Sequence, residues 1–199
     1  MISLTRKVQL SIEGDNFSAF GGLFAYGFKL EVEIGCSLFD LLCRQIGISE
    51  TYLNDRVQTI FLNGKVIDDI SSEILNDNSV IALSAAMPGL VGAVFRKGGI
   101  LSSMRSSYAS QATDVTMTNH RGPVILKLFN LIASDLGSDF LKKGIQIKGD
   151  YFIRYINWKR SLLESVCREL VIDGKKYEID DALSVCRQDG DVFLSINSV

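Results

Sequence analysis

The sequence predicts an α+β protein, with a small β-sheet domain at the N-terminus and a mainly helical second half. Near the N-terminus, residues 8–13 and 30–34 alternate apolar and polar side chains, as half-buried strands do. In the second half, apolar residues between 125 and 140 recur at helical spacing instead. The change of period along the chain places the protein in the α+β class.

The chain has 199 residues, which is enough for one large domain or for two of about 100 residues each. Between residues 89 and 121 the composition shifts towards Gly, Ser, Thr and Gln, as is typical of a connection between domains. We therefore expect a β-sheet domain at 1–88, a connection at 89–121 and a helical α+β domain with a small sheet at 122–199.

The N-terminal domain is expected to contain two strands, a helix and two further strands, in that order. Ser37 is placed to begin the helix and Gly47 to end it. The third strand, at 59–62, runs into Asn63-Gly64, a dipeptide that readily supplies the positive φ values of a tight turn. The fourth strand is expected at 80–83.

The second half is expected to contain two helices and a short strand. Pro123 suits the first position of a helix, which would then end at Gly144. Residues 145–147 alternate in the manner of a short strand. A second helix is expected from the capping residue Asp150, although the aromatic start of that segment could form a strand instead.

Two segments of the chain echo one another. Residues 61–65, with the turn Asn63-Gly64, correspond to residues 171–175, with the turn Asp173-Gly174. Each is followed by an acidic pair and then by an expected strand. Asn-Gly and Asp-Gly are common turn dipeptides, so a structural repeat and two independent hairpins both remain open.

The stretch Leu62-Asn63-Gly64-Lys65, together with residues 74–83, resembles the ubiquitin-like sulfur carriers of molybdopterin and thiamine biosynthesis, the MoaD/ThiS group. The resemblance covers roughly residues 8–92 and implies a ubiquitin-like β-grasp fold for this part of the chain. Members of that group end in Gly-Gly, and their terminal carboxylate is converted to a thiocarboxylate. This chain ends in Asn197-Ser198-Val199, so sulfur carriage would require cleavage after Gly99.

The composition argues against several classes of protein. With 21 basic and 23 acidic residues the net charge is −2, so we expect no nucleic-acid partner. The four cysteines form no CxxC pair, and His120 is the one histidine, so we expect no metal and no cofactor. The N-terminus has no continuous apolar segment, which favours a cytoplasmic location. Residues 78–95 are uncharged but are interrupted by Ser, Pro and Gly, so we expect no membrane span.

The connection between the first two strands is rich in aromatic residues and is a candidate partner-binding surface, because exposed apolar patches tend to be interaction sites. The candidate residues are Phe17, Phe20, Phe24, Tyr26 and Phe28. The alternative is that these rings pack over the open end of the core.

A second candidate site is a glycine-rich basic segment that could bind an anion through exposed backbone amides and cationic side chains. Its residues are Arg96, Lys97, Gly98, Gly99 and Arg105. The alternative is a plain connection, in which 90–96 and 100–105 pair as a hairpin across Lys97-Gly98-Gly99.

We identify no catalytic residue in the sequence. His120 has no evident nucleophile beside it, and the acidic pairs Asp68-Asp69 and Asp180-Asp181 are expected in solvated turns. The leading hypothesis is a non-catalytic binding or assembly module that contacts another protein or a second copy of itself. The alternatives are a sulfur carrier processed at Gly99 and a phosphate- or nucleotide-binding enzyme subunit that uses the Arg96–Arg105 segment.

Overall fold

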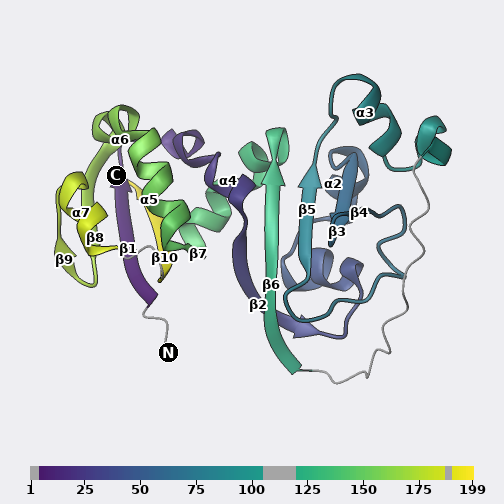
Figure 1. The fold of residues 1–199 in the computed structure, drawn as a ribbon, viewed down its shortest axis with the longest axis horizontal. Helices are drawn as coiled ribbons and strands as arrows, with labels where there is room; N and C mark the ends of the chain where they lie inside the picture. The colour runs from purple at the N-terminus through teal and green to yellow at the C-terminus, as the bar shows by residue number, and fades with distance from the viewer. Residues whose placement is uncertain (1–4, 105–119, 187–189) are drawn as a thin grey trace. The chain divides into compact units, whose positions relative to one another are not determined.

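The computed structural model describes residues 5–104, 120–186 and 190–199, and it is an α+β structure, as expected (Figure 1). The chain forms two compact units. The first unit joins Met1–Lys29 to Ala133–Val199, and the second unit is Leu30–Ile132. These bounds differ from those of the segments expected at 1–88, 89–121 and 122–199, because the N-terminal residues lie with the C-terminal half.

The second unit is built on a mixed sheet with the strand order β4-β3-β5-β6-β2. β5 and β6 are parallel, whereas β3 is antiparallel to both β4 and β5. The strands are β2 (Phe28–Ile34), β3 (Thr59–Leu62), β4 (Lys65–Val66), β5 (Val80–Ser84) and β6 (His120–Phe129). The helical segments are η2 (Asp40–Gln45), α2 (Glu50–Asp55), α3 (Gly89–Phe95) and η3 (Ile100–Met104).

The core of the second unit lies between this sheet and the helical segment that joins β2 to β3. Leu38, Leu41, Leu42 and Leu53 of that segment are buried. Each buried leucine side chain contributes about 2 kcal/mol through removal of apolar surface from water. As predicted, Ser37 begins the segment by accepting a hydrogen bond from the backbone N–H of Asp40, and Gly47 follows it with a positive φ of 90°.

The first unit is also built on a mixed sheet, with the strand order β7-β10-β1-β8-β9. Its strands are β1 (Thr5–Ile12), β7 (Ile145–Lys148), β8 (Cys167–Ile172), β9 (Lys175–Lys176) and β10 (Asp191–Ser198). Its helical segments are η1 (Asn16–Phe20), α1 (Leu23–Tyr26), most of α4 (Asn130–Lys143), α5 (Gly149–Trp158), α6 (Arg160–Val166) and α7 (Ile179–Val185).

β1 is a central strand of the first unit. It is parallel to β10 on one side and antiparallel to β8 on the other. Its alternation is that of a half-buried strand, as predicted, with Val8, Leu10 and Ile12 in the core. The first strand of the chain is therefore hydrogen-bonded to strands from the C-terminal half.

The helix expected from Pro123 is wrong over residues 123–129, which form the end of β6. The side chains that become buried are Val124, Leu126 and Leu128, with the period of two of a strand. Pairing with the parallel strand β5 decides the outcome, because Val80 to Ser84 lie opposite Ile125 to Phe129. The helix α4 begins only at Asn130, whose side-chain oxygen accepts the backbone N–H of Ala85 at 2.9 Å. Gly144 follows it with a φ of 94°, as predicted.

The β-hairpin considered for residues 90–96 and 100–105 is also wrong, because α3 and η3 are helical over the described residues. Gly92 allows α3 to pack closely, since a Cβ atom there would lie 1.9 Å from the carbonyl oxygen of Met87. The helix carries the Phe95 ring onto Phe61 of β3, in an edge-to-face contact of 5.7 Å between centroids.

The two hairpins that echo in the sequence have the same geometry. Asn63 and Gly64 have φ values of 51° and 80°, and Asp173 and Gly174 have values of 49° and 81°. In each turn the first residue makes two hydrogen bonds to one residue of the neighbouring strand. Its backbone N–H donates to the carbonyl of that residue, and its side-chain oxygen accepts the backbone N–H of the same residue. The partner of Asn63 is Val80, and the partner of Asp173 is Lys7. The counterpart of β5 in the first unit is therefore β1, not the strand that follows the hairpin in sequence.

Candidate functional site

The segment considered for anion binding folds as the turn between α3 and η3, and its donors are used within the chain. Arg96 Nε donates to Gln58 Oε1 at 2.9 Å. The backbone N–H of Lys97 donates to the carbonyl of Gln58 at 2.7 Å, and that of Gly98 donates to Asp68 Oδ1 at 3.0 Å. The carboxylate of Asp68 thus lies where a bound anion was expected. Gly99 donates its backbone N–H to Arg96, and Arg105 lies outside the described residues.

A groove of about 370 Å³ lies beside this turn in the second unit. Its lining includes Glu50, Asp68, Asp69 and Lys97. Three carboxylates around one ammonium group make the groove acidic, so it is better suited to a cation than to a phosphate.

The aromatic residues considered as a partner surface lie in the first unit, and four of the five are buried: Phe17, Phe20, Phe24 and Phe28. Phe28 contacts Phe24 and Phe140 at centroid distances of 5.7 and 4.9 Å. Tyr26 is 37% exposed and stacks on Tyr151 at 5.0 Å. The rings therefore pack within the unit, which is the alternative that the sequence left open.

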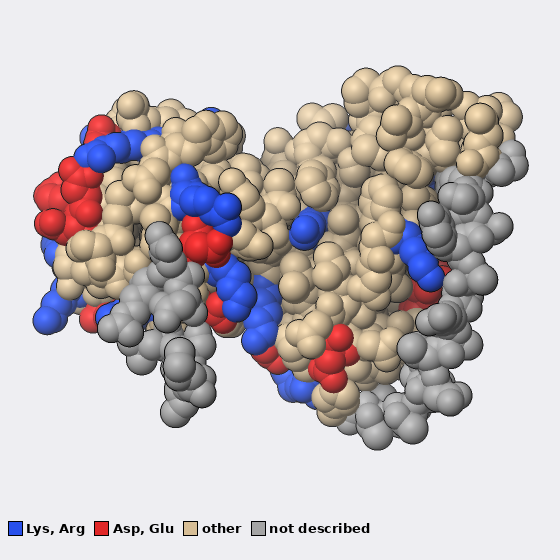
Figure 2. All heavy atoms as spheres, viewed as in Figure 1, with Lys and Arg blue, Asp and Glu red and all other residues tan. Residues whose placement is uncertain are grey.

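An apolar surface that the sequence did not single out lies on α3 and η3. Leu90, Val91, Ile100 and Met104 are 67%, 61%, 98% and 63% exposed. We call these four residues the α3–η3 surface. Figure 2 shows mainly uncharged atoms over α3, at the upper right. The signal in the sequence is the uncharged run of residues 78–95, which includes Leu90 and Val91 of this surface.

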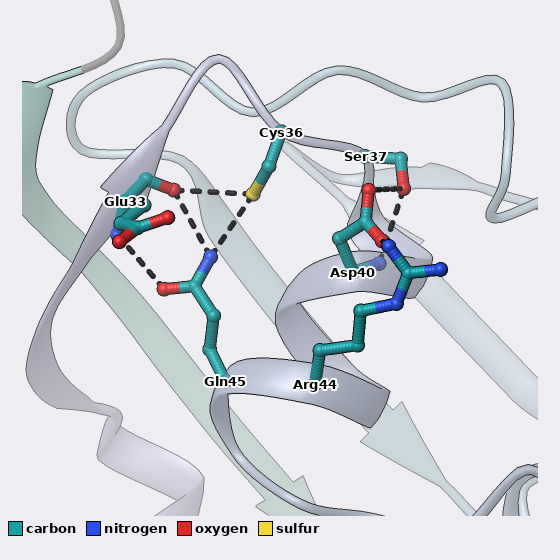
Figure 3. Close-up of polar contacts among 6 residues, drawn as sticks. All are labelled: Glu33, Cys36, Ser37, Asp40, Arg44 and Gln45. Atoms are coloured by element: carbon teal, nitrogen blue, oxygen red, sulfur yellow. Dashed lines mark hydrogen bonds and ion pairs between the residues drawn. The ribbon is translucent and has the colours of Figure 1, made fainter.

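Cys36 lies in a polar network at the start of η2 (Figure 3). Its thiol donates to the carbonyl of Glu33 at 3.1 Å. The side-chain amide of Gln45 donates to Cys36 Sγ at 3.2 Å and accepts the backbone N–H of Glu33 at 2.8 Å. Burial raises the pKa of the Cys36 thiol, with a further contribution from Asp40. A protonated thiol in these contacts joins β2 to η2 and is not an activated nucleophile.

The neighbouring residues complete the beginning of this helical segment. Ser37 Oγ donates to Asp40 Oδ2 at 2.9 Å, and Arg44 pairs with Asp40 Oδ1 at 2.7 Å (Figure 3). The segment is π-helical, and the backbone N–H of Ile46 bonds to the carbonyl of Leu41 at 2.9 Å. These contacts stabilise the segment and leave Asp40 engaged with its neighbours.

The other polar candidates form no recognisable catalytic group. His120 Nε2 lies 2.8 Å from Asp77 Oδ2, and both side chains are partly exposed. Within the described ranges, no three His, Cys, Asp or Glu residues come together as a metal site. In the same part of the chain, no helix is long and apolar enough to cross a membrane.

A groove of about 480 Å³ lies in the first unit. It is lined by residues of α6, β8, β9 and the start of α7, all between Glu164 and Asp181. Cys167 is among them, and burial raises the pKa of its thiol. Cys186, outside the groove, is buried, and this raises the pKa of its thiol to about 11.

No protein-family model, curated protein or solved structure matches the chain. Its function is therefore inferred from the residues and the geometry described above.

Proposed function

We propose that this protein is a non-catalytic binding or assembly module, and that it contacts another protein chain through the α3–η3 surface. The observation that carries the proposal is the exposure of four large apolar side chains within residues 90–104. Exposed apolar side chains that gather in one place are typical of interaction sites, because covering them removes apolar surface from water.

The charges around this surface support a protein partner. Between Ser79 and Met104 the sequence contains no acidic residue. The two basic side chains of the stretch are turned to internal acceptors, since Arg96 bonds to Gln58 and Lys97 Nζ bonds to the carbonyl of Leu53 at 3.2 Å. An uncharged apolar surface resembles the core of a protein–protein interface, where charged residues are depleted.

We further propose that the second unit has a β-grasp-like arrangement, with a helical segment packed on a small mixed sheet. The order β2, helical segment, β3 and β5 supports this and follows the order expected from the sequence. In this proposal β6, which pairs with β5, provides the further strand of the domain that was expected from residues 8–13.

The α3–η3 surface can be tested with the double variant Leu90→Gln/Ile100→Gln. Both side chains are exposed, so the variant should fold with unchanged stability and lose a partner or a second copy from the complex. The control is Val199→Gln, because Val199 is 72% exposed in the first unit. Native mass spectrometry of the protein purified from its own cells under mild conditions measures the outcome. A complex that is equally abundant in both variants, or a monomer without a stoichiometric partner, would contradict the proposal.

The other two functions considered have less support. Gly98 and Gly99 lie within the folded turn between α3 and η3, whereas sulfur carriage requires an extended C-terminal tail. An intact mass ending at Gly99 would favour that function. Binding of a phosphate at the same turn would have to displace the carboxylate of Asp68.

A further inference from the structure

The two units contain equivalent grooves. The hairpin turns are 110 residues apart, as Asn63 and Asp173 show, and the next contact keeps this spacing: Ile67 donates to Ile60 and Tyr177 donates to Leu170. By the same spacing Asn54 and Asp68 of the second-unit groove correspond to Glu164 and Glu178 of the first-unit groove. Both grooves therefore lie beside the β-hairpin of their own unit.

One wall of the groove of the second unit is formed by a peptide segment of the same chain. Lys97 and Gly98 line it. Their backbone N–H groups donate to the carbonyl of Gln58 and to the carboxylate of Asp68, and the Lys97 ammonium group donates to the carbonyl of Leu53. The second unit thus shows which chemistry fits: a short basic segment with small residues, bound through its backbone and one cationic side chain.

Among the described residues, no such segment lines the groove of the first unit. All of its described lining lies between Glu164 and Asp181, so no described residue takes the place of Lys97 and Gly98. By the 110-residue spacing, Arg168 of the first unit corresponds to Gln58 of the second unit. The pairing of β8 with β1 has a register shift at Arg168, because Ser11 pairs with Glu169 and Ile12 pairs with Cys167. The groove is also larger, at about 480 Å³ against about 370 Å³.

Carboxylates dominate the lining of this groove, which we call the Glu178 groove. The acidic residues in its described lining are Glu164, Glu169, Glu178, Asp180 and Asp181. Its two basic residues are paired, because Arg168 bonds to Glu13 and Lys176 bonds to Glu169. In Figure 2, acidic side chains gather over α7 at the left of the view.

Two of these carboxylates are available to a ligand. Arg160 engages Glu164 and Asp180. Within the described residues, the carboxylates of Glu178 and Asp181 make no hydrogen bond or ion pair. Glu178 is the counterpart of Asp68, which accepts the backbone N–H of Gly98 in the other unit.

We propose that the Glu178 groove binds a short, extended, basic segment of a partner protein, in which a Lys or Arg precedes a small residue. Glu178 accepts a backbone N–H of that segment, as Asp68 does from Gly98. The cationic side chain of the segment lies against Asp181. This site is on the first unit and does not depend on the α3–η3 surface, so either proposal can fail without the other.

The probe is a capped synthetic peptide with the sequence of residues 94–100, VFRKGGI, added to the full-length protein. Fluorescence anisotropy of the labelled peptide should show saturable binding that weakens as salt rises, because the contacts are charged and exposed. Glu178→Gln/Asp181→Asn should weaken binding about fivefold or more, as expected for two exposed charge contacts. Asp15→Asn and Glu31→Gln together are the control, because they remove two carboxylates outside the groove.

A second peptide, in which both basic residues are replaced by Gln, should not bind. Amide NMR shifts should change mainly between residues 164 and 181 when the basic peptide is added. The proposal would be overturned if the basic peptide failed to bind at millimolar concentration, or if the groove variant and the control bound it equally. Shifts confined to the second unit would overturn it as well.

Discussion

Asp173 and Asn63 accept equivalent hydrogen bonds at the two hairpin turns, but only Asp173 carries a charge. Each has a positive φ and accepts the backbone N–H of the neighbouring strand through its side-chain oxygen. Asp173 also pairs with Arg6 at 2.6 Å. The N–H of Lys7 and then the guanidinium of Arg6 lower the pKa of Asp173, because both favour its ionised form.

This pKa shift gives a pH dependence of known sign. A carboxyl group with a lowered pKa in the folded state stabilises the protein above its ordinary pKa of about 3.9, and that contribution is lost as the pH falls through the folded-state value. Asp173→Asn keeps the acceptor, as Asn63 shows. We expect it to cost about 0.5 kcal/mol at pH 7, since the ion pair is exposed.

As the pH falls below the folded-state pKa of Asp173, the cost of Asp173→Asn should shrink, because both states then bind the proton. Urea unfolding of the two proteins at pH 7 and pH 2 measures the difference. Asp15→Asn serves as the control, because Asp15 is exposed and its side chain makes no N-cap hydrogen bond. An equal cost for Asp173→Asn at both pH values would contradict this account.

The hairpin turns of the two units are elements whose geometry was predictable from sequence, because the dipeptides Asn-Gly and Asp-Gly determine it locally. We expect Gly64→Ala and Gly174→Ala to destabilise the protein by about 1 kcal/mol each, since a side chain disfavours positive φ. Apart from the glycine and its two chain neighbours, no atom lies within 4 Å of either added Cβ, so the cost is conformational and not a clash.

Gly21→Ala is the matched control for the two turn variants. Gly21 has a φ of −54°, and its added Cβ would meet only the carbonyl oxygen of Ser18, at 3.4 Å. Chemical denaturation should show a loss at the turns and little or none at Gly21. Equal effects at all three positions would mean that the turn conformation does not explain the glycines.

Two elements show that the local pattern of apolar residues is not sufficient to predict secondary structure. Residues 123–129 have apolar side chains that fit a helix and a strand equally well, and pairing with β5, about 45 residues earlier, decides for the strand. Likewise, residues 89–95 were expected to belong to a connection or to one side of a hairpin, but they form a helix whose Phe95 ring contacts Phe61 of β3. Such distant contacts leave no periodic signal in the segment itself.

The candidate sites were predictable only in part, for the same reason. The Gly, Arg and Lys residues at 96–99 indicated a basic turn. The sequence did not indicate that the carboxylate of Asp68 would bind to this turn. The Glu178 groove needs α6, β8 and α7 to come together, and no short motif spans them. The exposure of Ile100 depends on which side of η3 packs against the rest of the second unit, and this cannot be predicted from the sequence of the segment alone.

At the scale of the whole molecule, the position of β1 is what the sequence did not reveal. Residues 8–13 were expected to belong with the domain that follows them in the chain. Instead, β1 lies between β10 and β8 and completes the first unit. The first unit thus depends on strand pairs whose residues are 155 to 186 positions apart, whereas the second unit is one continuous segment.

Leu10→Ala should therefore destabilise the first unit, including the C-terminal half, more than the second unit at Leu30–Ile132. Leu10 is buried in β1, and its truncation should cost about 2–5 kcal/mol. Hydrogen exchange followed by mass spectrometry should show faster exchange in β8 and β10, with β3 and β5 unchanged. Leu83→Ala in β5 is the mirror control, because Leu83 is equally buried in the second unit and should give the opposite pattern. If both variants accelerated exchange throughout the chain, the two units would unfold as one.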